Sequence, residues 1–202
     1  GCDGLELNMA ILPYETTLSC EDVDRLFSDI INTLRKSVSI PISVKVSHNF
    51  TDMANFMQRL SWMGINGITM FNKSLNVDID TDTMQIKHAP SLSTPEELYE
   101  TLRWVAILSK KLRCDISAST GVHKPEDVVK LLLAGAGSVQ VVSCLYKNGV
   151  EYMRTLNEGL RSWMAEKGFD SIQQFAGKLA VKANEQASLF FRTQFMKHFA
   201  QL

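Results

Sequence analysis

The sequence predicts an α/β protein built on a parallel β-sheet that is covered by helices. Five short β-type runs recur along the chain at 4–8, 42–47, 67–71, 115–120 and 138–143. Each run leads into a segment with helical periodicity, and this alternation is typical of βαβ units whose strands are buried on both faces. With 202 residues, 45% of them hydrophobic and 21% charged, the chain has the composition of one globular domain.

The segments after these runs carry the start and stop signals of helices. Ser19 opens a capping-box-like pattern, and apolar residues continue after it at helical spacing. Thr94-Pro95 places a cap residue before a proline in the first helical turn, and Pro125 opens another helix in the same way. A long helix is expected over residues 150–167, with Gly168 as its stop.

A long connection, residues 72–93, separates the third and fourth runs. It exceeds the ~2 to 6 residues that usually join a strand to a helix. Residues 77–80 and 83–86 within it alternate apolar and polar side chains, which predicts a small hairpin standing off the main sheet. Because long loops at the carboxyl ends of parallel strands often build lids over ligands, this connection is a candidate functional segment.

Five strand-helix units leave two arrangements open. The sheet is either open or part of an eight-stranded barrel, whose whole length is usually about 250 residues. The chain begins with Gly1-Cys2-Asp3-Gly4 and no lead-in before an apolar strand, which favours a piece of a longer barrel. Residues 1–180 are therefore expected to form a partial barrel. The aromatic-rich residues 181–202 are expected to form a C-terminal helical extension that caps a barrel end or mediates dimerisation.

The bulk composition argues against several classes of function. Lysine and arginine number 21 and aspartate and glutamate 22, so the net charge of -1 gives no reason to expect nucleic acid or an anionic membrane as partner. The longest apolar stretches fall short of the roughly 20 residues of a membrane span. The four cysteines form no Cys-x-x-Cys pair and the four histidines show no metal-ligand spacing. Reduced cytoplasmic thiols, no bound metal and a small polar ligand are therefore expected.

Lys45 is the most informative residue, because it lies within the otherwise apolar strand 42–46. A lysine is costly to bury unless an anion or an electron-rich acceptor lies beside it. One interpretation is a cation placed against a ligand that gains negative charge, such as a flavin during reduction. The other is a strand-end lysine whose ammonium extends to solvent. The residue pattern leaves both interpretations open.

Other polar residues follow the ends of the predicted strands. Ser119-Thr120-Gly121 and Val142-Ser143 each lead from a strand toward a helix, as in barrel phosphate sites, although small residues are also common in such turns. Asn8 and Asn72 stand at two neighbouring strand ends and suit a planar imide or carboxylate ligand. The alternative for each asparagine is local turn capping.

Motifs at these positions resemble the successive strands of dihydroorotate dehydrogenases. The matching segments keep the family's order and approximate spacing, and they are Glu6-Leu7-Asn8, Val44-Lys45, Phe71-Asn72, Ser119-Thr120-Gly121-Val122 and 134–141. Residues 168–179 are similar to the helix that follows the last barrel strand in that family. The resemblance implies the C-terminal portion of a (β/α)8 TIM barrel, with about five of the eight units present in this chain.

The resemblance also implies an FMN-dependent oxidoreductase that acts on a CH-CH bond and converts dihydroorotate to orotate in pyrimidine biosynthesis. Lys45 then stands beside the flavin pyrimidine ring as the catalytic stabiliser of the reduced cofactor. The implied phosphate-side residues are Ser119, Thr120, Gly121, Val142 and Ser143, and the implied substrate-binding residues are Asn8 and Asn72. A pyrimidine-like substrate and a homo-oligomer, in the form of a dimer, are the expected partners.

The chain departs from the family in the loop after the first strand. Ile11 stands where the family has a cysteine or serine general base, and Pro13 replaces a substrate-binding asparagine. An aliphatic side chain accepts no proton, and general-base help is worth roughly 100- to 10,000-fold in rate. Lys73 replaces a small hydroxyl residue and Val142 a glycine. The pattern resembles a dihydroorotate dehydrogenase-like subgroup that keeps flavin-site features without an intact general base.

Three hypotheses follow for the function. The first is an FMN oxidoreductase of this family, and the second is a catalytically altered or inactive flavin-binding relative with a regulatory or subunit role. The third is a protein that keeps only the scaffold, since a fold does not determine a function.

Overall fold

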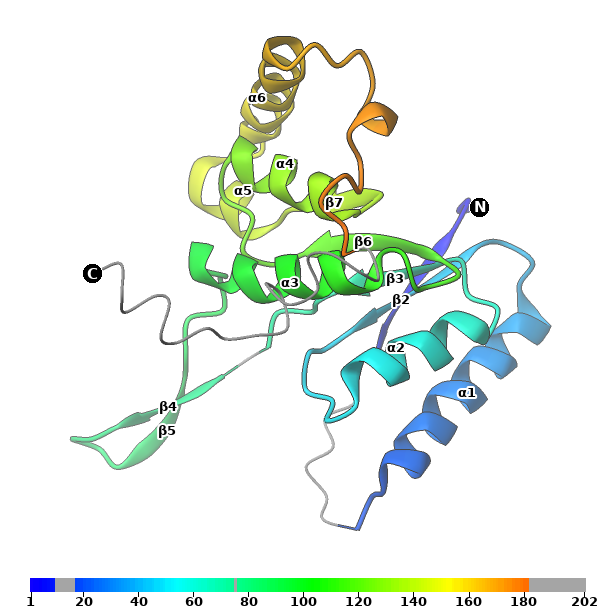
Figure 1. Cartoon of the computed structure of the whole chain (residues 1–202). Coiled ribbons are helices and arrows are strands. Elements are labelled where there is room, and N and C mark those ends of the chain that lie inside the picture. Colours follow the sequence, from blue (N-terminus) through cyan, green and yellow to red (C-terminus); the bar gives the residue numbers. More distant parts are fainter. Residues whose placement is uncertain (10–16, 75, 182–202) are drawn as a thin grey trace, which may run out of the picture.

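The five runs form one parallel sheet with the strand order β1-β2-β3-β6-β7 (Figure 1). The computed structural model describes residues 1–9, 17–74 and 76–181. In the described residues a separate antiparallel pair, β4 and β5, makes a second small sheet. The main sheet therefore has the strand-helix alternation and parallel pairing of a (β/α)8 barrel, of which it supplies five strands.

The elements occur in the following order. They are β1 (Leu5–Met9), α1 (Cys20–Ser37), β2 (Ile42–Val46), α2 (Met53–Trp62), β3 (Gly67–Met70), β4 (Val77–Asp80), β5 (Gln85–His88), the 3-10 helix η1 (Pro95–Glu97), α3 (Leu98–Leu108), β6 (Asp115–Ser119), α4 (Pro125–Ala134), β7 (Ser138–Gln140), α5 (Ser143–Asn148), α6 (Tyr152–Glu166) and the 3-10 helix η2 (Ile172–Gln174).

The start of α1 confirms the predicted capping box. The backbone N-H of Asp22 donates to the Ser19 hydroxyl at 3.2 Å, and the Asp22 carboxylate accepts from the Ser19 N-H at 3.0 Å. The apolar stripe that follows buries Phe27 and Ile31 completely. Burial of side chains of this size contributes about 1.5 to 3 kcal/mol each, so this face holds α1 to the sheet.

Helices α1, α2 and α3 lie along one face of the sheet, whereas α4 and α6 pack together beside β7 (Figure 1). Strand β2 explains this arrangement through its alternation. Ile42, Val44 and Val46 are fully buried on the helix-covered side, and Ser43 and Lys45 point to the opposite face. The expectation that strands are buried on both faces is confirmed for the middle strand β3, where Ile68, Thr69 and Met70 are all buried. It is wrong for β1, whose Glu6 and Asn8 are exposed.

The sheet is strongly curved, because side chains from its two edge strands meet. Glu6 lies on β1 and Gln140 on β7, four strands apart, which in a flat sheet is a distance of ~19 Å. Nevertheless the Gln140 Nε2 lies 2.8 Å from the Glu6 Oε2. Such curvature is what closure into a barrel requires.

Among the main strands, the largest change from a predicted boundary is in the fifth. The fifth strand ends at Gln140, and Val142 and Ser143 cap and begin the short helix α5 rather than ending the strand. The helix expected over 150–167 is α6, and Gly168 after it has φ +70°, a left-handed conformation that favours glycine. The hairpin is confirmed, with its second strand at Gln85–His88. It projects away from the sheet (Figure 1).

The expected C-terminal extension lies almost wholly outside the described residues, which end at 181. No helix in the described part of the chain combines the length and apolarity needed to cross a membrane.

Candidate functional site

A cavity of about 210 Å³ opens at the carboxyl ends of the parallel strands. Its lining residues come from β2, β6 and β7 and from the segments that follow β3, β5, β6 and β7: Lys45, Asn72, Lys73, Ser91, Leu92, Ser93, Ser119, Thr120, Gly121, Val122, Gln140, Val141, Val142 and Ser143. The cavity thus gathers every site residue that the sequence predicts except Asn8. The carboxyl edge of the strands is where barrel proteins place their ligands.

Lys45 lies on β2 and is partly buried. Its side chain extends from the inner, concave face of the sheet, opposite the face that the helices cover. The Lys45 Nζ donates to the Gln140 Oε1 at 3.1 Å. An ammonium has three donors, and no other hydrogen-bond partner of this one lies among residues 1–9, 17–74 and 76–181. The cation is therefore held at one point by an amide oxygen and keeps donor capacity at the cavity.

Asn8 and Asn72 contact each other through their side chains. The Asn72 Nδ2 donates to the Asn8 Oδ1 at 2.9 Å. The two residues do not follow neighbouring strands, as the sequence suggested, because β2 lies between β1 and β3. Asn72 follows β3 in the chain, and its backbone N-H donates to the Val46 carbonyl at 2.8 Å. This bond fixes Asn72 beside the carboxyl end of β2. The side-chain bond between the two asparagines leaves the Asn8 amide nitrogen and the Asn72 amide oxygen without a side-chain hydrogen-bond partner among the described residues.

The turn after β6 is conformationally strained. Thr120 has φ +81°, which is unusual for a β-branched residue and costs about 1 to 3 kcal/mol. Its hydroxyl donates to the Phe71 carbonyl at 2.9 Å, so the turn is tied to the chain that leaves β3. Gly121 follows with φ +80°, and its N-H lies 3.3 Å from the Ser93 hydroxyl oxygen. Strain of this kind persists where surrounding contacts hold it, often at functional sites.

Ser93 connects this turn to the first residue of α5. The Ser93 N-H donates to the Ser143 hydroxyl oxygen at 2.8 Å, which leaves the Ser143 proton available to a ligand. The carbonyl of Ser93 lies 2.9 Å from the His123 Nε2 and 3.2 Å from the Lys147 Nζ. Four residues from two segments, the turn after β6 and helix α5, therefore converge on one buried serine. The hydroxyl groups that line this side of the cavity belong to Ser91, Ser93, Ser119, Thr120 and Ser143.

Lys73 brings a second ammonium to the cavity wall. Its Nζ lies 2.6 Å from the Glu97 Oε1, and the side chains are 22% and 32% exposed. Glu97 also accepts from the Thr94 N-H at 2.6 Å as part of the cap of the η1 turn. The Lys73 charge is therefore paired with a carboxylate of η1, whereas the Lys45 ammonium contacts only a neutral amide.

Comparison with known proteins identifies the family. Residues 4–164 match the family model described as dihydroorotate dehydrogenase. The chain belongs to this family. This result confirms the resemblance read from the strand motifs and the TIM-barrel type of fold.

The most similar relatives include catalytic subunits of dihydroorotate dehydrogenase B (NAD(+)). The protein of Thermoplasma acidophilum is 28% identical over 181 residues, which are 88% of this chain and 60% of the relative. The protein of Bacillus pumilus is 27% identical over 178 residues, which are 86% of this chain and 57% of the relative. The protein of Pyrococcus furiosus is 25% identical over 181 residues, which are 87% of this chain and 60% of the relative. The chain thus spans about 60% of the length of these relatives.

The residues of the expected base loop, Ile11 and Pro13, lie outside the described residues. The described thiol nearest in sequence to the phosphate-side residues is Cys144, which is completely buried in α5. Burial raises the pKa of the Cys144 thiol, and a protonated thiol is a poor nucleophile and no general base. Cys144 is therefore a packing residue rather than a candidate nucleophile.

Sequence reasoning missed three polar residues of the cavity: Gln140, Ser91 and Ser93. Gln140 stands between Val139 and Val141, so it carries the same signal that singled out Lys45, a lone polar side chain in an apolar strand. The two serines sit in the long connection after the hairpin, where nothing in the local pattern predicts their approach to β6 and α5.

The cysteines are expected to separate into two reactivity classes. Cys2 and Cys20 are exposed, whereas burial and the nearby Asp115 raise the pKa of the Cys114 thiol to about 11. At pH 8 a thiol with that pKa is thiolate in only about one molecule in a thousand, so Cys114 and the buried Cys144 should react slowly. Labelling with iodoacetamide and peptide mass spectrometry measures each site, and labelling in denaturant, where all four should react, is the control. Equal rates at the four sites in the native protein would contradict the burial described.

Proposed function

We propose that the protein is an FMN-dependent oxidoreductase that oxidises the CH-CH bond of a dihydropyrimidine, with dihydroorotate as substrate. The observation that carries the proposal is the convergence of Lys45, Asn72 and the two hydroxyl-rich turns on one cavity at the strand ends, in a chain of the dihydroorotate dehydrogenase family. Relatives named as catalytic subunits of dihydroorotate dehydrogenase B (NAD(+)) support the same reaction.

Each described residue has a role in this proposal. The Lys45 ammonium would stand beside the pyrimidine edge of FMN and favour its more negatively charged, reduced form. The Ser119, Thr120 and Gly121 turn, with Val142 and Ser143, would hold the phosphate through hydroxyl and backbone donors. Asn8 and Asn72 would orient the substrate through their free amide groups. When bound, FMN supplies the two-electron acceptor.

The described residues fit one edge of FMN rather than the whole molecule. The cavity of about 210 Å³ is smaller than the roughly 300 to 1,000 Å³ usual for ligand sites. Its cation and hydroxyl wall nevertheless match an anionic, oxygen-rich group. The remaining wall of the site would come from segments other than those described.

A second candidate function is a flavin-binding relative with altered or no activity toward dihydroorotate. The observation that favours it is Ile11, because an aliphatic side chain cannot take the proton that must leave the substrate carbon. The mutual hydrogen bond of Asn8 and Asn72 agrees with it, since a substrate must compete with that bond for the same amides. Such a protein would serve as a regulatory or structural subunit.

Partners and location remain predictions. The name of the relatives as catalytic subunits supports an electron-accepting partner subunit in addition to the homodimer that we expect. We also expect a cytoplasmic location, where the free thiols of the described cysteines would stay reduced.

The experiment is an absorption spectrum of the full-length protein followed by anaerobic addition of dihydroorotate. The proposal predicts flavin peaks that bleach, and orotate that forms in equal amount to the FMN reduced. Dithionite, which reduces flavin without an enzyme site, is the control that shows that the bound FMN is reducible. Flavin peaks that bleach with dithionite but not with dihydroorotate would favour the second candidate. A colourless protein that does not take up added FMN would favour the hypothesis that the protein keeps only the scaffold of the family.

A further inference from the structure

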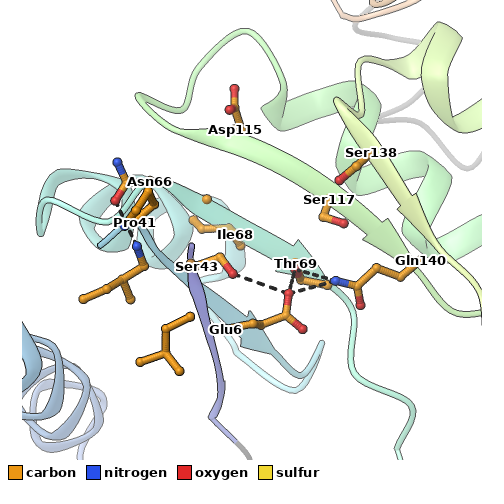
Figure 2. Close-up of a pocket in the computed structure, with 14 residues that line it drawn as sticks. Glu6, Pro41, Ser43, Asn66, Ile68, Thr69, Asp115, Ser117, Ser138 and Gln140 are labelled. Carbon is orange, nitrogen blue, oxygen red and sulfur yellow. Dashed lines mark hydrogen bonds between the residues drawn. The ribbon is translucent and has the colours of Figure 1, made fainter. Parts of the chain in front are cut away.

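Gln140 lies between a cation and a carboxylate on the inner face of the sheet. Its Oε1 accepts from the Lys45 Nζ at 3.1 Å, and its Nε2 donates to the Glu6 Oε2 at 2.8 Å. Figure 2 shows Glu6 and Gln140 pointing toward each other from the two edge strands, with Thr69 between them. Three side chains from β1, β2 and β7 therefore form one hydrogen-bonded series across the curved face.

The orientation of the Gln140 amide follows from its neighbours. An ammonium only donates hydrogen bonds, and an ionised carboxylate only accepts them. The amide oxygen must therefore face Lys45 and the amide nitrogen must face Glu6. The reverse orientation would break both bonds and place two donors against each other, so the carboxylate determines which end of the amide is presented to the lysine.

Glu6 is itself held by the middle of the sheet. The hydroxyl of Thr69, which is fully buried, donates to the same Glu6 oxygen at 2.6 Å. The Ser43 hydroxyl lies 3.5 Å from that oxygen. The Gln140 Nε2 also lies 3.5 Å from the Thr69 hydroxyl. Donors from β2, β3 and β7 thus converge on one carboxylate oxygen, which fixes its position under the cavity that contains Lys45.

We propose that Glu6 and Gln140 are positioning residues, which hold the Lys45 ammonium at the floor of the cavity so that its free donors face the pyrimidine edge of bound FMN. This inference rests on the proposed function, in which Lys45 stabilises the reduced cofactor. Neither residue touches the substrate or FMN in this account. They act through Lys45.

The reason for such a device lies in the flexibility of lysine. A lysine side chain has many rotamers, and a cation that moves away from the ring does not favour its reduced form. An amide that is oriented by a carboxylate gives the ammonium one preferred position, and donors arranged in advance stabilise developing charge best. The carboxylate also offsets part of the cost of keeping a cation in the sheet interior.

The first test is the two-electron reduction potential of FMN bound to the full-length protein. Gln140→Leu removes the amide with little change of size, and Glu6→Gln keeps the shape of the side chain but removes the charge that orients the amide. Gln140→Leu is expected to weaken the preference for reduced over oxidised FMN by at least tenfold, which lowers the potential by about 30 mV. Glu6→Gln is expected to lower it less, because loss of a nearby negative charge by itself favours the reduced form.

The matched control for these variants is Ser117→Ala. Ser117 faces the same inner surface (Figure 2), and its buried hydroxyl has no hydrogen-bond partner in the described part of the chain. Its removal should leave the potential unchanged. A potential of Gln140→Leu that equals that of Ser117→Ala, in proteins that bind FMN normally, would overturn the inference while leaving the proposed function intact.

A second measurement separates the inference from the proposed function, because it needs no FMN. The side-chain amide protons of Gln140 are assigned in an NMR spectrum of the FMN-free protein by their loss in Gln140→Leu. Glu6→Gln should move these signals and Ser117→Ala should not. Signals that Glu6→Gln leaves in place would overturn the inference. If the signals move but the protein binds no FMN, the proposed function fails while the holding of Lys45 by Glu6 and Gln140 stands.

Discussion

Replacing Lys45 with methionine is expected to slow the reduction of bound FMN by dihydroorotate about 100- to 1,000-fold, the effect of removing one donor aimed at developing charge. Methionine keeps the length of the side chain without the ammonium, so the inner face stays filled. The reason is local, because Lys45 is the cation that contacts only a neutral amide in the cavity, whereas Lys73 is paired with Glu97. Stopped-flow absorbance under anaerobic conditions measures the rate directly.

The control for Lys45→Met is the same substitution at Lys87. Lys87 lies on the exposed hairpin, where it forms an ion pair with Asp78 at 3.3 Å, so its removal changes the net charge equally without touching the cavity. Lys87→Met should reduce FMN at the rate of the unchanged protein. A Lys45→Met protein that keeps bound FMN and reduces it within threefold of that rate would rule out the role proposed for Lys45.

Periodicity was sufficient to predict most of the elements. In α1 and β2, burial of one face imposes spacings of 3.6 and 2 residues, and both spacings are visible in the apolar residues alone. The same periodicity indicated where the strands end, and it therefore predicted that Lys45 and Ser119 lie near the carboxyl edge of the sheet. Family membership rests on the family match, which agrees with motifs that were readable without a structure.

The end of the fifth strand could not be predicted from its composition. Val141 and Val142 are β-branched and continue the pattern of β7, yet the strand stops at Gln140. Strand β7 pairs with β6, whose last residue, Ser119, is opposite Gln140. Because Thr120 turns away with positive φ, Val141 has no neighbouring strand to bond. Strand length here depends on a turn in another part of the chain.

The partner of Lys45 was equally hidden from sequence reasoning. The residue pattern offered solvent or a ligand as the alternatives, whereas the ammonium binds Gln140, which lies 95 residues away in the sequence. The contact exists because the sheet curves enough for β2 to reach β7 across its inner face, and curvature arises from twist accumulated over several strands. A polar residue inside an apolar run marks a candidate, but only the three-dimensional arrangement identifies its partner.

Gly121→Ala is expected to destabilise the protein by more than about 4 kcal/mol, a loss confined to mutations that force a severe clash or strain. Its φ of +80° disfavours any residue with a Cβ, and the added Cβ would lie 2.6 Å from the Leu98 Cα and 2.8 Å from the Glu97 carbonyl carbon. These are backbone atoms at the start of α3, so no side chain can move aside. Urea unfolding followed by circular dichroism measures the change in the free energy of unfolding.

Gly149→Ala is the matched control, because Gly149 has φ +85° but no atom within 4 Å of the added Cβ. It measures the cost of a positive φ without a clash, which is about 1 to 3 kcal/mol because Gly149, with ψ 161°, lies in a region that is essentially confined to glycine. The family resemblance assigns Gly121 to the phosphate side of the site, and the structure also packs it against the start of α3. If Gly121→Ala is clearly less stable than Gly149→Ala, packing against α3 is the reason that a glycine is needed at position 121. If the two variants are equally stable but Gly121→Ala binds FMN more weakly, the glycine is needed for phosphate binding instead.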